Sequence, residues 1–330
     1  MYRLDQITNL HIELTTRCNA VCPMCMRNYR GVDHNDGYPL TELRLPDIKK
    51  IFSEDFCQQI QSIHFNGNLG DFSLAQDALD IIDYFLKYTS AEIMISTNGS
   101  TRSPDWWSQL ADPRISVVFA LDGLEDTHHL YRQHTNWHKI INNARTLIAS
   151  GGNAIWKMIE FDHNRHQVEQ CRDLSRDIGF KNFFLINDGR DRGPVYTRDG
   201  KFSHWLGPAH DDPPDIDDLL QEHRTWFMQE TKFDWLKDRM GNISCEAKKY
   251  NSIYIAADGS IYPCCYTGFY PSVMHHPGNE QLKHMLHENN ALEHDLQHCI
   301  SWFERIEQSW SNPSINQGRP MICVRNCGQK

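Results

Sequence analysis

Three cysteines near the N-terminus have the spacing of a metal-binding loop. Cys18, Cys22 and Cys25 form a C-x3-C-x2-C pattern that directly follows an expected strand. Three thiolates can bind three irons of a 4Fe-4S cluster and leave the fourth iron without a protein ligand, which a cluster held by four cysteines cannot do. A zinc knuckle is the alternative, because His11 and His34 lie nearby.

A second group of cysteines lies beyond residue 240. We predict that Cys245, Cys264, Cys323 and Cys327 hold a second, auxiliary 4Fe-4S cluster, because four thiolates saturate a cubane and suit a buried electron carrier. A structural zinc ion bound by the same four thiolates is the alternative. Cys265 is open to three interpretations, as a replacement ligand, a hydrogen-atom donor or a small buried apolar group, of which packing is favoured.

The other cysteines and a pair of histidines favour structural roles. Cys57, Cys171 and Cys299 fall on helical faces, where a thiol packs as a small hydrophobic group. His134 and His138 stand four residues apart, but no acidic residue lies between them. We therefore interpret them as surface or core histidines and not as zinc ligands.

The elements that must position the first cysteine loop follow from the hydrophobic pattern. Apolar runs bounded by turn residues predict six strands, and helical periodicity is clearest at 74–88, 137–149 and 167–178. The strands are expected at residues 10–15, 62–65, 92–97, 115–121, 154–161 and 182–186. Alternating strands and helices predict an α/β fold, a partial (β/α)6 TIM-like barrel with a parallel sheet and its chemistry at the carboxyl ends of the strands.

Polar motifs fall at these strand ends. Residues 67–71, Gly-Asn-Leu-Gly-Asp, follow the second strand, Thr97-Asn98-Gly99 follows the third, and Asp122-Gly123 follows the fourth. Taken singly, an Asn-Gly or Asp-Gly pair is more often a simple turn. Arg132 follows Asp122 along the chain, and it is either a ligand for a carboxylate or a solvated helix arginine.

The chain beyond the sixth strand divides into two further parts. Residues 188–214 are rich in Gly, Pro, Asp and Arg without a period, which is typical of a long connection or domain boundary. A helix is expected over 215–240, a hairpin at 252–255 and 260–263, and more helix over about 279–310. We predict a barrel at 1–190, a connection and substrate-facing insertion at 191–240, and a small C-terminal α+β iron-sulfur domain at 241–330.

The bulk composition excludes several classes of protein. The 330 residues are 40% hydrophobic and 23% charged, which is typical of a globular protein. A net charge of -10 does not attract a phosphate backbone or an anionic membrane, and no run approaches the roughly 18 apolar residues of a membrane span. We expect no nucleic acid and no membrane as partners. Eleven cysteines and the lack of a signal-peptide pattern at residues 1–10 favour a cytoplasmic protein.

The motif of Cys18, Cys22 and Cys25 resembles that of the radical S-adenosylmethionine (SAM) superfamily, and the likeness covers residues 7–188. The resemblance implies that the free iron chelates the amino and carboxyl groups of SAM. One electron then releases methionine and a 5'-deoxyadenosyl radical, which abstracts a hydrogen atom from the substrate. The cofactors supply this chemistry, and the protein supplies orientation and a dry cavity.

The strand-end motifs extend this resemblance. Residues 67–72 resemble the family's Gly-Gly-Glu-Pro strand end, so Asn68, Gly70 and Asp71 are expected at the methionine ammonium group, with Phe72 where proline is usual. By the same resemblance, Thr97 and Asn98 are expected near the ribose, and Met24 near the adenine. Asp122 matches the strand-four motif of the family and is also expected to contact SAM.

The second cysteine group resembles the twitch domain, a shortened relative of the SPASM domain. This resemblance implies modification of a ribosomally made peptide or protein. The substrate is recognised either by a separate leader-recognition protein or directly by residues 188–214. An electron donor such as flavodoxin or ferredoxin is also implied. The alternatives are a radical dehydrogenase of a small alcohol or aminocyclitol, and a non-enzymatic binding module stabilised by metal.

Overall fold

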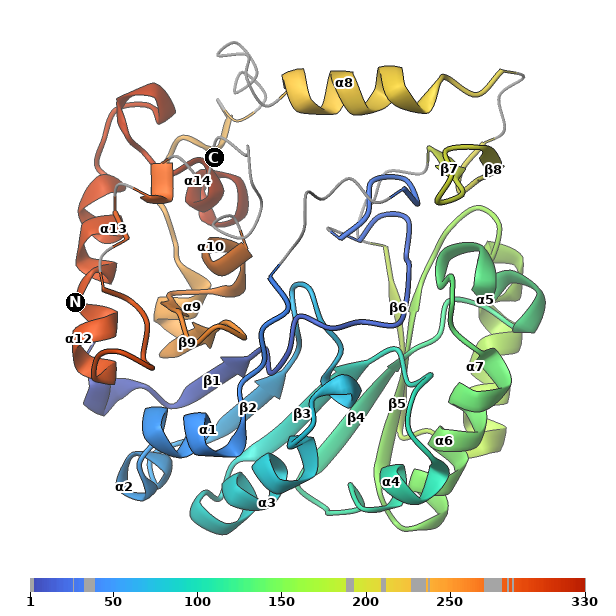
Figure 1. The fold of residues 1–330 in the computed structure, drawn as a ribbon, viewed down its shortest axis with the longest axis horizontal. Helices are drawn as coiled ribbons and strands as arrows, with labels where there is room; N and C mark the ends of the chain where they lie inside the picture. The colour runs from blue at the N-terminus through green and yellow to red at the C-terminus, as the bar shows by residue number, and fades with distance from the viewer. Residues whose placement is uncertain are drawn as a thin grey trace.

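The computed structural model describes residues 3–25, 27–32, 39–187, 193–208, 212–226, 236, 238–269, 281–283, 285–286 and 288–329. The described strands form one eight-stranded sheet and a separate two-stranded sheet. The order in the large sheet is β10-β9-β1-β2-β3-β4-β5-β6 (Figure 1). Its strands are β1 (Asn9–Ile12), β2 (Ser62–Phe65), β3 (Glu92–Thr97), β4 (Ile115–Ala120), β5 (Asn153–Ile159), β6 (Asn182–Ile186), β9 (Ser252–Ile255) and β10 (Ile261–Tyr262).

Strands β1 to β6 pair in sequence order, and every pair is parallel. Helices lie between them in the chain, as parallel crossovers require. These are α1 (Leu45–Ile51), α2 (Glu54–Cys57), α3 (Ala78–Tyr88), α4 (Pro104–Ser108), α5 (Glu125–Tyr131), α6 (Trp137–Ala149) and α7 (Val168–Ile178), with the 3-10 turns η2 (Phe72–Leu74) and η3 (Arg165–Gln167). A further 3-10 turn, η1 (Leu4–Gln6), precedes β1. The predicted α/β class, with six βα units in a partial barrel, is confirmed.

The alternation of side chains along the strands decides which face of the sheet the helices cover. Ile12 of β1 and Phe65 of β2 are fully buried, pair in register, and belong to one core cluster with Ile81 of α3. Successive side chains of a strand point to opposite faces. His11 and His64 therefore face away from the helices, toward the inner side of the barrel.

Local signals set the ends of the helices. At the start of α6, the side chain of Asn136 accepts a hydrogen bond of 2.9 Å from the backbone N–H of Lys139, which satisfies a donor that the helix leaves free. At the end of α7, Gly179 adopts a φ of 98°, a left-handed conformation that favours glycine. The helix that periodicity predicts over residues 137–149 is present as α6.

The C-terminal region continues the barrel sheet. β9 pairs in parallel with β1, and β10 pairs antiparallel with β9, so the predicted hairpin is confirmed and lies at the edge of the large sheet. The helices of this region are α9 (Glu246–Lys249), α10 (Cys265–Phe269), α12 (Leu296–Ser301), α13 (Phe303–Ser309) and α14 (Met321–Cys327), with the 3-10 turn η6 (Ile315–Gln317). The division at residues 190 and 240 remains a prediction.

Two expectations about the second half of the chain need correction. The connection predicted over 188–214 contains an antiparallel pair, β7 (Pro194–Tyr196) and β8 (Phe202–Trp205), whose short strands show no clear period. The helix predicted over 279–310 is wrong as one helix, because the backbone around Asn290 bonds to the hairpin turn at Ser260 and Gly259. Residues 270–280, 284 and 287 lie outside the described part of the chain.

The helix predicted over 215–240 is present as α8 (Ile216–Trp226), while residues 227–235 and 237 are not described. Among the helices that the structure describes, none combines the length and the apolar character that crossing a membrane requires.

Candidate active site

The three N-terminal cysteines lie in one loop that follows β1. The backbone N–H of Cys25 donates to the carbonyl of Cys22 at 3.0 Å, and the N–H of Asn28 donates to the carbonyl of Cys25 at 2.8 Å. The side-chain amide of Asn28 also reaches the carbonyl of Cys22, at 3.2 Å. Cys22 is buried, whereas Cys18 and Cys25 are partly exposed. Hydrogen bonds within the loop therefore fix the turn that carries these thiols.

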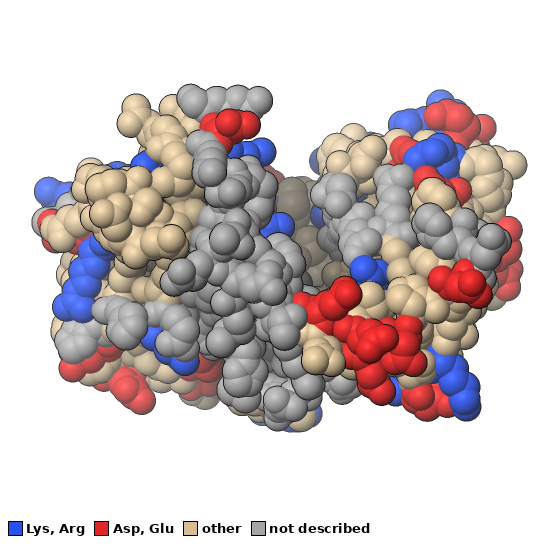
Figure 2. All heavy atoms as spheres, turned by 90° about the horizontal axis from the view of Figure 1, so that it is seen from above, with Lys and Arg blue, Asp and Glu red and all other residues tan. Residues whose placement is uncertain are grey.

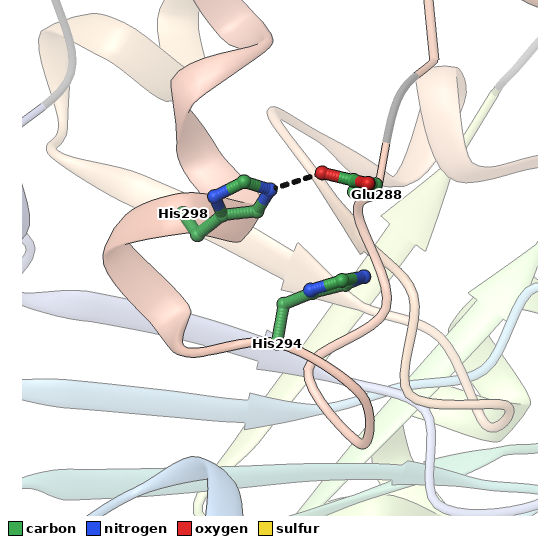
Figure 3. A group of neighbouring side chains, drawn as sticks. All are labelled: Glu288, His294 and His298. Atoms are coloured by element: carbon green, nitrogen blue, oxygen red, sulfur yellow. Dashed lines mark hydrogen bonds and ion pairs between the residues drawn. The ribbon is translucent and has the colours of Figure 1, made fainter.

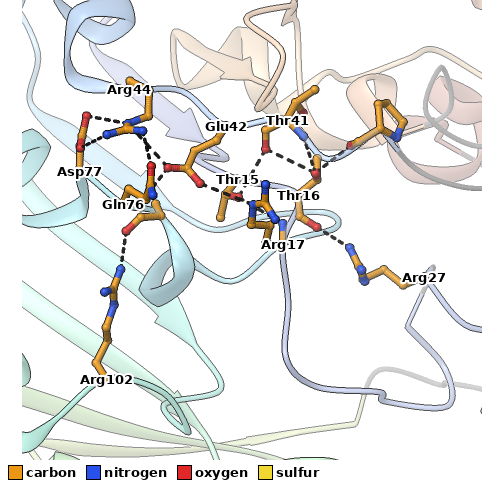
Figure 4. A network of polar contacts seen from close by, with 12 residues as sticks. Thr15, Thr16, Arg17, Arg27, Thr41, Glu42, Arg44, Gln76, Asp77 and Arg102 are labelled. Carbon is orange, nitrogen blue, oxygen red and sulfur yellow. Dashed lines mark hydrogen bonds and ion pairs between the residues drawn. The ribbon is translucent and has the colours of Figure 1, made fainter.

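A polar network anchors the start of this loop (Figure 4). The Thr16 hydroxyl donates to the carbonyl of Pro39 at 2.9 Å and accepts the backbone N–H of Thr41 at 3.0 Å. Arg27 donates to the carbonyl of Thr16 from the other side of the loop. These contacts tie the chain before Cys18 to a neighbouring segment and to the far end of the same loop.

The three sulfur atoms of the loop do not lie at the mutual distances of ligands around one zinc ion. Tetrahedral zinc with Zn–S bonds of about 2.3 Å would bring its sulfur ligands to about 3.8 Å from one another. Within the described part of the chain, no three cysteines bring their sulfur atoms within 4.8 Å of one another. A 4Fe-4S cluster binds each thiolate at a separate iron and therefore does not require such a close approach of the sulfur atoms.

Asp71 and Asn98 meet beside the cysteine loop. The Oδ2 atom of buried Asp71 accepts the backbone N–H of Asn98 at 2.7 Å, and its Oδ1 atom accepts the Thr97 hydroxyl at 2.8 Å and the Ser73 hydroxyl at 2.6 Å. The side-chain amide of Asn98 lies 3.8 Å from the sulfur of Cys18. Asp71 therefore positions Asn98 against Cys18, and direct contacts of Asp71, Thr97 and Asn98 with SAM remain predictions.

Asp122 and Arg132 form a buried ion pair beside the same loop. The Nε atom of Arg132 lies 2.6 Å from Oδ2 of the fully buried Asp122, and its Nη1 atom lies 3.8 Å from the sulfur of Cys22. Burial opposes the charge of Arg132, but the Asp122 carboxylate raises the pKa of Arg132 well above its usual value. The interpretation of Arg132 as a solvated arginine is therefore wrong, and a permanent positive charge lies beside Cys22.

Two thiols of the loop, those of Cys18 and Cys22, lie in a setting that disfavours free thiolates. Burial raises the pKa of Cys22 to about 11, although Arg132 opposes the rise, and burial also raises the pKa of Cys18. A thiolate at these positions needs a positive partner beyond the arginine. Iron supplies such a charge, because a coordinating thiol is deprotonated by the ion that it binds.

Glu13 holds the Gly-rich loop that follows β2. Its Oε1 atom accepts the backbone N–H groups of Leu69 at 2.7 Å and Gly70 at 2.9 Å, and its Oε2 atom accepts the hydroxyl of Tyr254 at 2.7 Å. Burial raises the pKa of Glu13, while these three donors oppose the rise. Sequence reasoning missed Glu13; its signal was an acidic residue between the apolar residues Ile12 and Leu14.

The four cysteines predicted for the auxiliary cluster line one small cavity of about 20 Å³. Apolar side chains, including those of Ile306, Trp310 and Ile322, complete its wall. The lining cysteines are Cys245, Cys264, Cys323 and Cys327. Three separate segments of the chain therefore bring thiols to one apolar place. Their role as cluster ligands remains a prediction.

The remaining cysteines lie apart from this cavity lining. Cys57, Cys171 and Cys299 are fully buried in the hydrophobic core, as predicted. Cys265 is partly exposed and packs against the core cluster, while its backbone carbonyl accepts a hydrogen bond of 2.9 Å from the side-chain amide of Asn68. Asn68 thus joins the loop after β2 to the segment that carries Cys264.

The inner side of the barrel carries polar groups that the sequence did not single out. The rings of His11 and His64 stack with centroids 5.0 Å apart, and His64 Nε2 lies 3.0 Å from the Ser96 hydroxyl. Burial, with smaller contributions from His11 and Lys157, lowers the pKa of His64 to about 3. Figure 2, which views the molecule from above, shows a recess between two sides of the surface. Neutral imidazoles therefore line part of the barrel interior.

Solved structures share this arrangement of strands and helices. SuiB of Streptococcus suis, bound to S-adenosylmethionine, aligns with a TM-score of 0.53 and 18% identity over 79% of this chain and 60% of SuiB. The fold resembles that of SuiB. SuiB bound to its precursor peptide SuiA gives a TM-score of 0.56 at 18% identity, over 88% of this chain and 64% of SuiB. The chain thus spans less than two thirds of SuiB.

A second similar structure is anSMEcpe with bound AdoMet and the Cp18Cys peptide. Its TM-score is 0.54 at 13% identity, and the alignment covers 94% of this chain and 88% of anSMEcpe. No protein-family model and no curated protein matches the sequence. At these identities the likeness shows a common fold, and the chemistry must be argued from the residues of this chain.

Proposed function

We propose that this chain is a radical SAM enzyme that modifies a ribosomally synthesised peptide or a protein. The observation that carries the proposal is the loop of Cys18, Cys22 and Cys25 at the carboxyl end of β1, with the side chains of Asn98 and Arg132 beside its sulfur atoms. When bound by these cysteines, a 4Fe-4S cluster supplies the electron that cleaves SAM to a 5'-deoxyadenosyl radical able to abstract a hydrogen atom.

The residues of the chain would bind and orient SAM around this loop. The backbone of residues 67–70, which Glu13 holds by accepting its N–H groups, would bind the methionine end of SAM. Asp71 holds the turn at Asn98, which would face the ribose. Arg132 contributes a positive charge beside the loop, suited to the SAM carboxylate. Preorganised donors of this kind need no rearrangement when the substrate arrives.

The second cysteine set is proposed to hold an auxiliary 4Fe-4S cluster of the twitch type. Cys245, Cys264, Cys323 and Cys327 come from three segments and share one apolar cavity. Four thiolates leave no iron free for SAM, so a cluster there would transfer an electron or help to position the substrate. The Asn68–Cys265 hydrogen bond links this region to the loop after β2.

A peptide substrate is favoured over a small alcohol because of the similar structures. SuiB binds the precursor peptide SuiA, and anSMEcpe binds the Cp18Cys peptide. We propose that such a peptide would lie in the recess that Figure 2 shows between the two sides of the surface. A separate leader-recognition protein and a flavodoxin or ferredoxin donor complete the proposal.

Anaerobic reconstitution followed by incubation with SAM and a reductant tests the function. We expect about eight irons per chain in the wild type and formation of 5'-deoxyadenosine. Replacing Cys18, Cys22 and Cys25 by Ala should remove about half of the iron and all of the deoxyadenosine, whereas Cys323→Ala with Cys327→Ala should spare some uncoupled SAM cleavage. Cys171→Ala, which replaces a thiol of the hydrophobic core that belongs to neither cysteine set, is the control.

The substrate class is tested with the same material and candidate precursor peptides. Deuterium incorporation or a loss of two daltons in a peptide would support peptide modification. Oxidation of a small alcohol without any change in the peptides would support the dehydrogenase instead. A folded, colourless protein that contains only zinc would contradict both activities and leave the binding module.

A further inference from the structure

Glu288, His294 and His298 bring three ligand atoms together (Figure 3). One ligand atom of each residue lies within 4.8 Å of the ligand atoms of the other two. His298 Nε2 lies 2.7 Å from Glu288 Oε2, and the two imidazole rings stack with centroids 4.9 Å apart. Two imidazoles and a carboxylate thus converge from two segments of the chain.

The backbone holds the two histidines in this position. The N–H of His294 donates to the carbonyl of Asn290 at 3.0 Å, and the Cys299 thiol donates to the carbonyl of His294 at 3.8 Å. Asp295 caps α12 by accepting the N–H of His298 at 2.8 Å, so its carboxylate is used by the helix. The start of α12 therefore presents both rings on one side.

The segment that carries Glu288 is fixed independently. Glu288 has a φ of 45°, which a residue with a side chain rarely adopts and which requires support from its surroundings. Two residues later, Asn290 donates to the carbonyl of Asp258 at 2.9 Å, and the N–H of Ala291 donates to the carbonyl of Gly259 at 2.9 Å. The turn between β9 and β10 thus anchors the loop, and the carboxylate is brought to the histidines before any ligand binds.

The chemistry of this ligand set suits one class of ion. Two imidazoles and one glutamate form the three-ligand set that zinc uses when it keeps a fourth position for water. About two fifths of the Glu288 and His298 side chains are exposed, at 44% and 41%, so an ion from solvent can reach them. His138 and Glu125 differ from this group, because their Nε2 and Oε1 atoms lie 2.8 Å apart but form a pair without a third ligand among the described residues.

We propose that Glu288, His294 and His298 form a binding site for zinc or a similar divalent transition metal. The ion would join the loop at Glu288 to the start of α12 and hold both against the β9–β10 turn. This site is separate from the iron-sulfur chemistry proposed above, because none of its ligand atoms is a thiol.

The test uses the full chain with its thiols occupied by anaerobic iron-sulfur reconstitution, so that zinc cannot bind to vacant cysteines. After equilibrium dialysis against ZnCl2, the zinc content and the binding isotherm are measured. We expect one zinc per chain in the wild type and a rise in the unfolding temperature with zinc concentration. His294→Ala, His298→Ala and Glu288→Gln should each weaken zinc binding by about tenfold or more.

His138→Ala is the matched control, since it removes a histidine that pairs with a single glutamate, and it should bind zinc as the wild type does. Iron content and circular dichroism verify that each variant is folded. Wild-type zinc affinity in folded His294→Ala and His298→Ala would overturn the proposal, and so would a wild type that retains no zinc.

Discussion

The side-chain amide of Asn68 donates a hydrogen bond of 2.9 Å to the backbone carbonyl of Cys265. Asn68 lies in the loop after β2, and Cys265 is the first residue of α10. A second long-range hydrogen bond runs from the hydroxyl of Tyr254 on β9 to the carboxylate of Glu13 at 2.7 Å. The loop proposed to receive SAM is therefore joined to the segment proposed to hold the auxiliary cluster directly at Asn68, and to β9 through Glu13, which accepts the N–H groups of Leu69 and Gly70.

Tyr254→Phe should destabilise the protein by about 1–3 kcal/mol, because it leaves an oxygen of the buried Glu13 without its donor. Tyr84→Phe is the control, since its hydroxyl donates at 2.7 Å to a neutral backbone carbonyl, that of Phe52. Chemical denaturation of both variants measures the difference. Equal losses of unfolding free energy in the two variants would show that the hydrogen bond to Glu13 stabilises the protein no more than a hydrogen bond to a neutral carbonyl.

Gly70→Ala should prevent the loop after β2 from forming. A Cβ atom at residue 70 would lie 1.6 Å from the backbone carbonyl oxygen of Thr15, and neither backbone can move without disturbing the segment before Cys18. Gly151→Ala is the control, because a Cβ there meets nothing within 4 Å and only the φ of 88° opposes it, at a cost of about 1 kcal/mol. We expect Gly70→Ala to lose bound iron and stability, and Gly151→Ala to retain its iron. Full iron loading in Gly70→Ala would contradict the geometry.

Local sequence patterns were sufficient for most of the barrel. The strands at 62–65, 92–97 and 182–186 were predicted to the residue, because apolar residues there are bounded by turn residues. The helix at 137–149 was found equally well. The grouping of the four C-terminal cysteines in one cavity could be anticipated in part, because several cysteines in one region of a chain indicate a metal site.

Long-range partners could not be anticipated in this way. Glu13 and Tyr254 are 241 positions apart, and nothing in either local sequence indicates the other. The pairing of β9 with β1 is hidden for the same reason. Asp71 was predicted to face the cofactor because of a motif, but a motif does not reveal that the Thr97 hydroxyl and the Asn98 N–H also bond to its carboxylate.

Arg132→Gln should lower the reduction potential of a cluster at Cys18, Cys22 and Cys25. The guanidinium lies 3.8 Å from the sulfur of Cys22, and a nearby positive charge stabilises the more negative, reduced cluster. Arg132→Lys keeps the charge and should recover much of the shift. A redox titration followed by electron paramagnetic resonance measures the potential.

The control for this experiment is Arg165→Gln, which removes an arginine that is 55% exposed and paired with Glu160. Its potential should equal that of the wild type. An unchanged potential in folded Arg132→Gln would refute the influence of the guanidinium on the cluster.

The stability of the protein should fall as the pH is lowered below about 6.5, where an unfolded imidazole gains a proton. The pKa of His64 is about 3 in the fold, so between these values the unfolded state binds the additional proton and is favoured. The stabilising contribution of the neutral ring is complete above about pH 6.5 and is lost progressively toward pH 3, by about 1.4 kcal/mol per pH unit for each such histidine. His64→Gln should reduce the pH slope by this amount, as measured by denaturation between about pH 5 and pH 6. Identical slopes in wild type and variant would count against a buried neutral His64.

The parallel pairing of β9 with β1 also governs the order in which the molecule can be assembled. β1 is synthesised before the other strands of its sheet, yet its outer neighbour β9 follows about 240 residues later, so one edge of β1 stays open while the strands between them are made. During that interval the exposed N–H and carbonyl groups of residues 9–12 form a template on which another nascent chain can pair. A chain that terminates before Ser252 would keep this open edge permanently and be prone to aggregation.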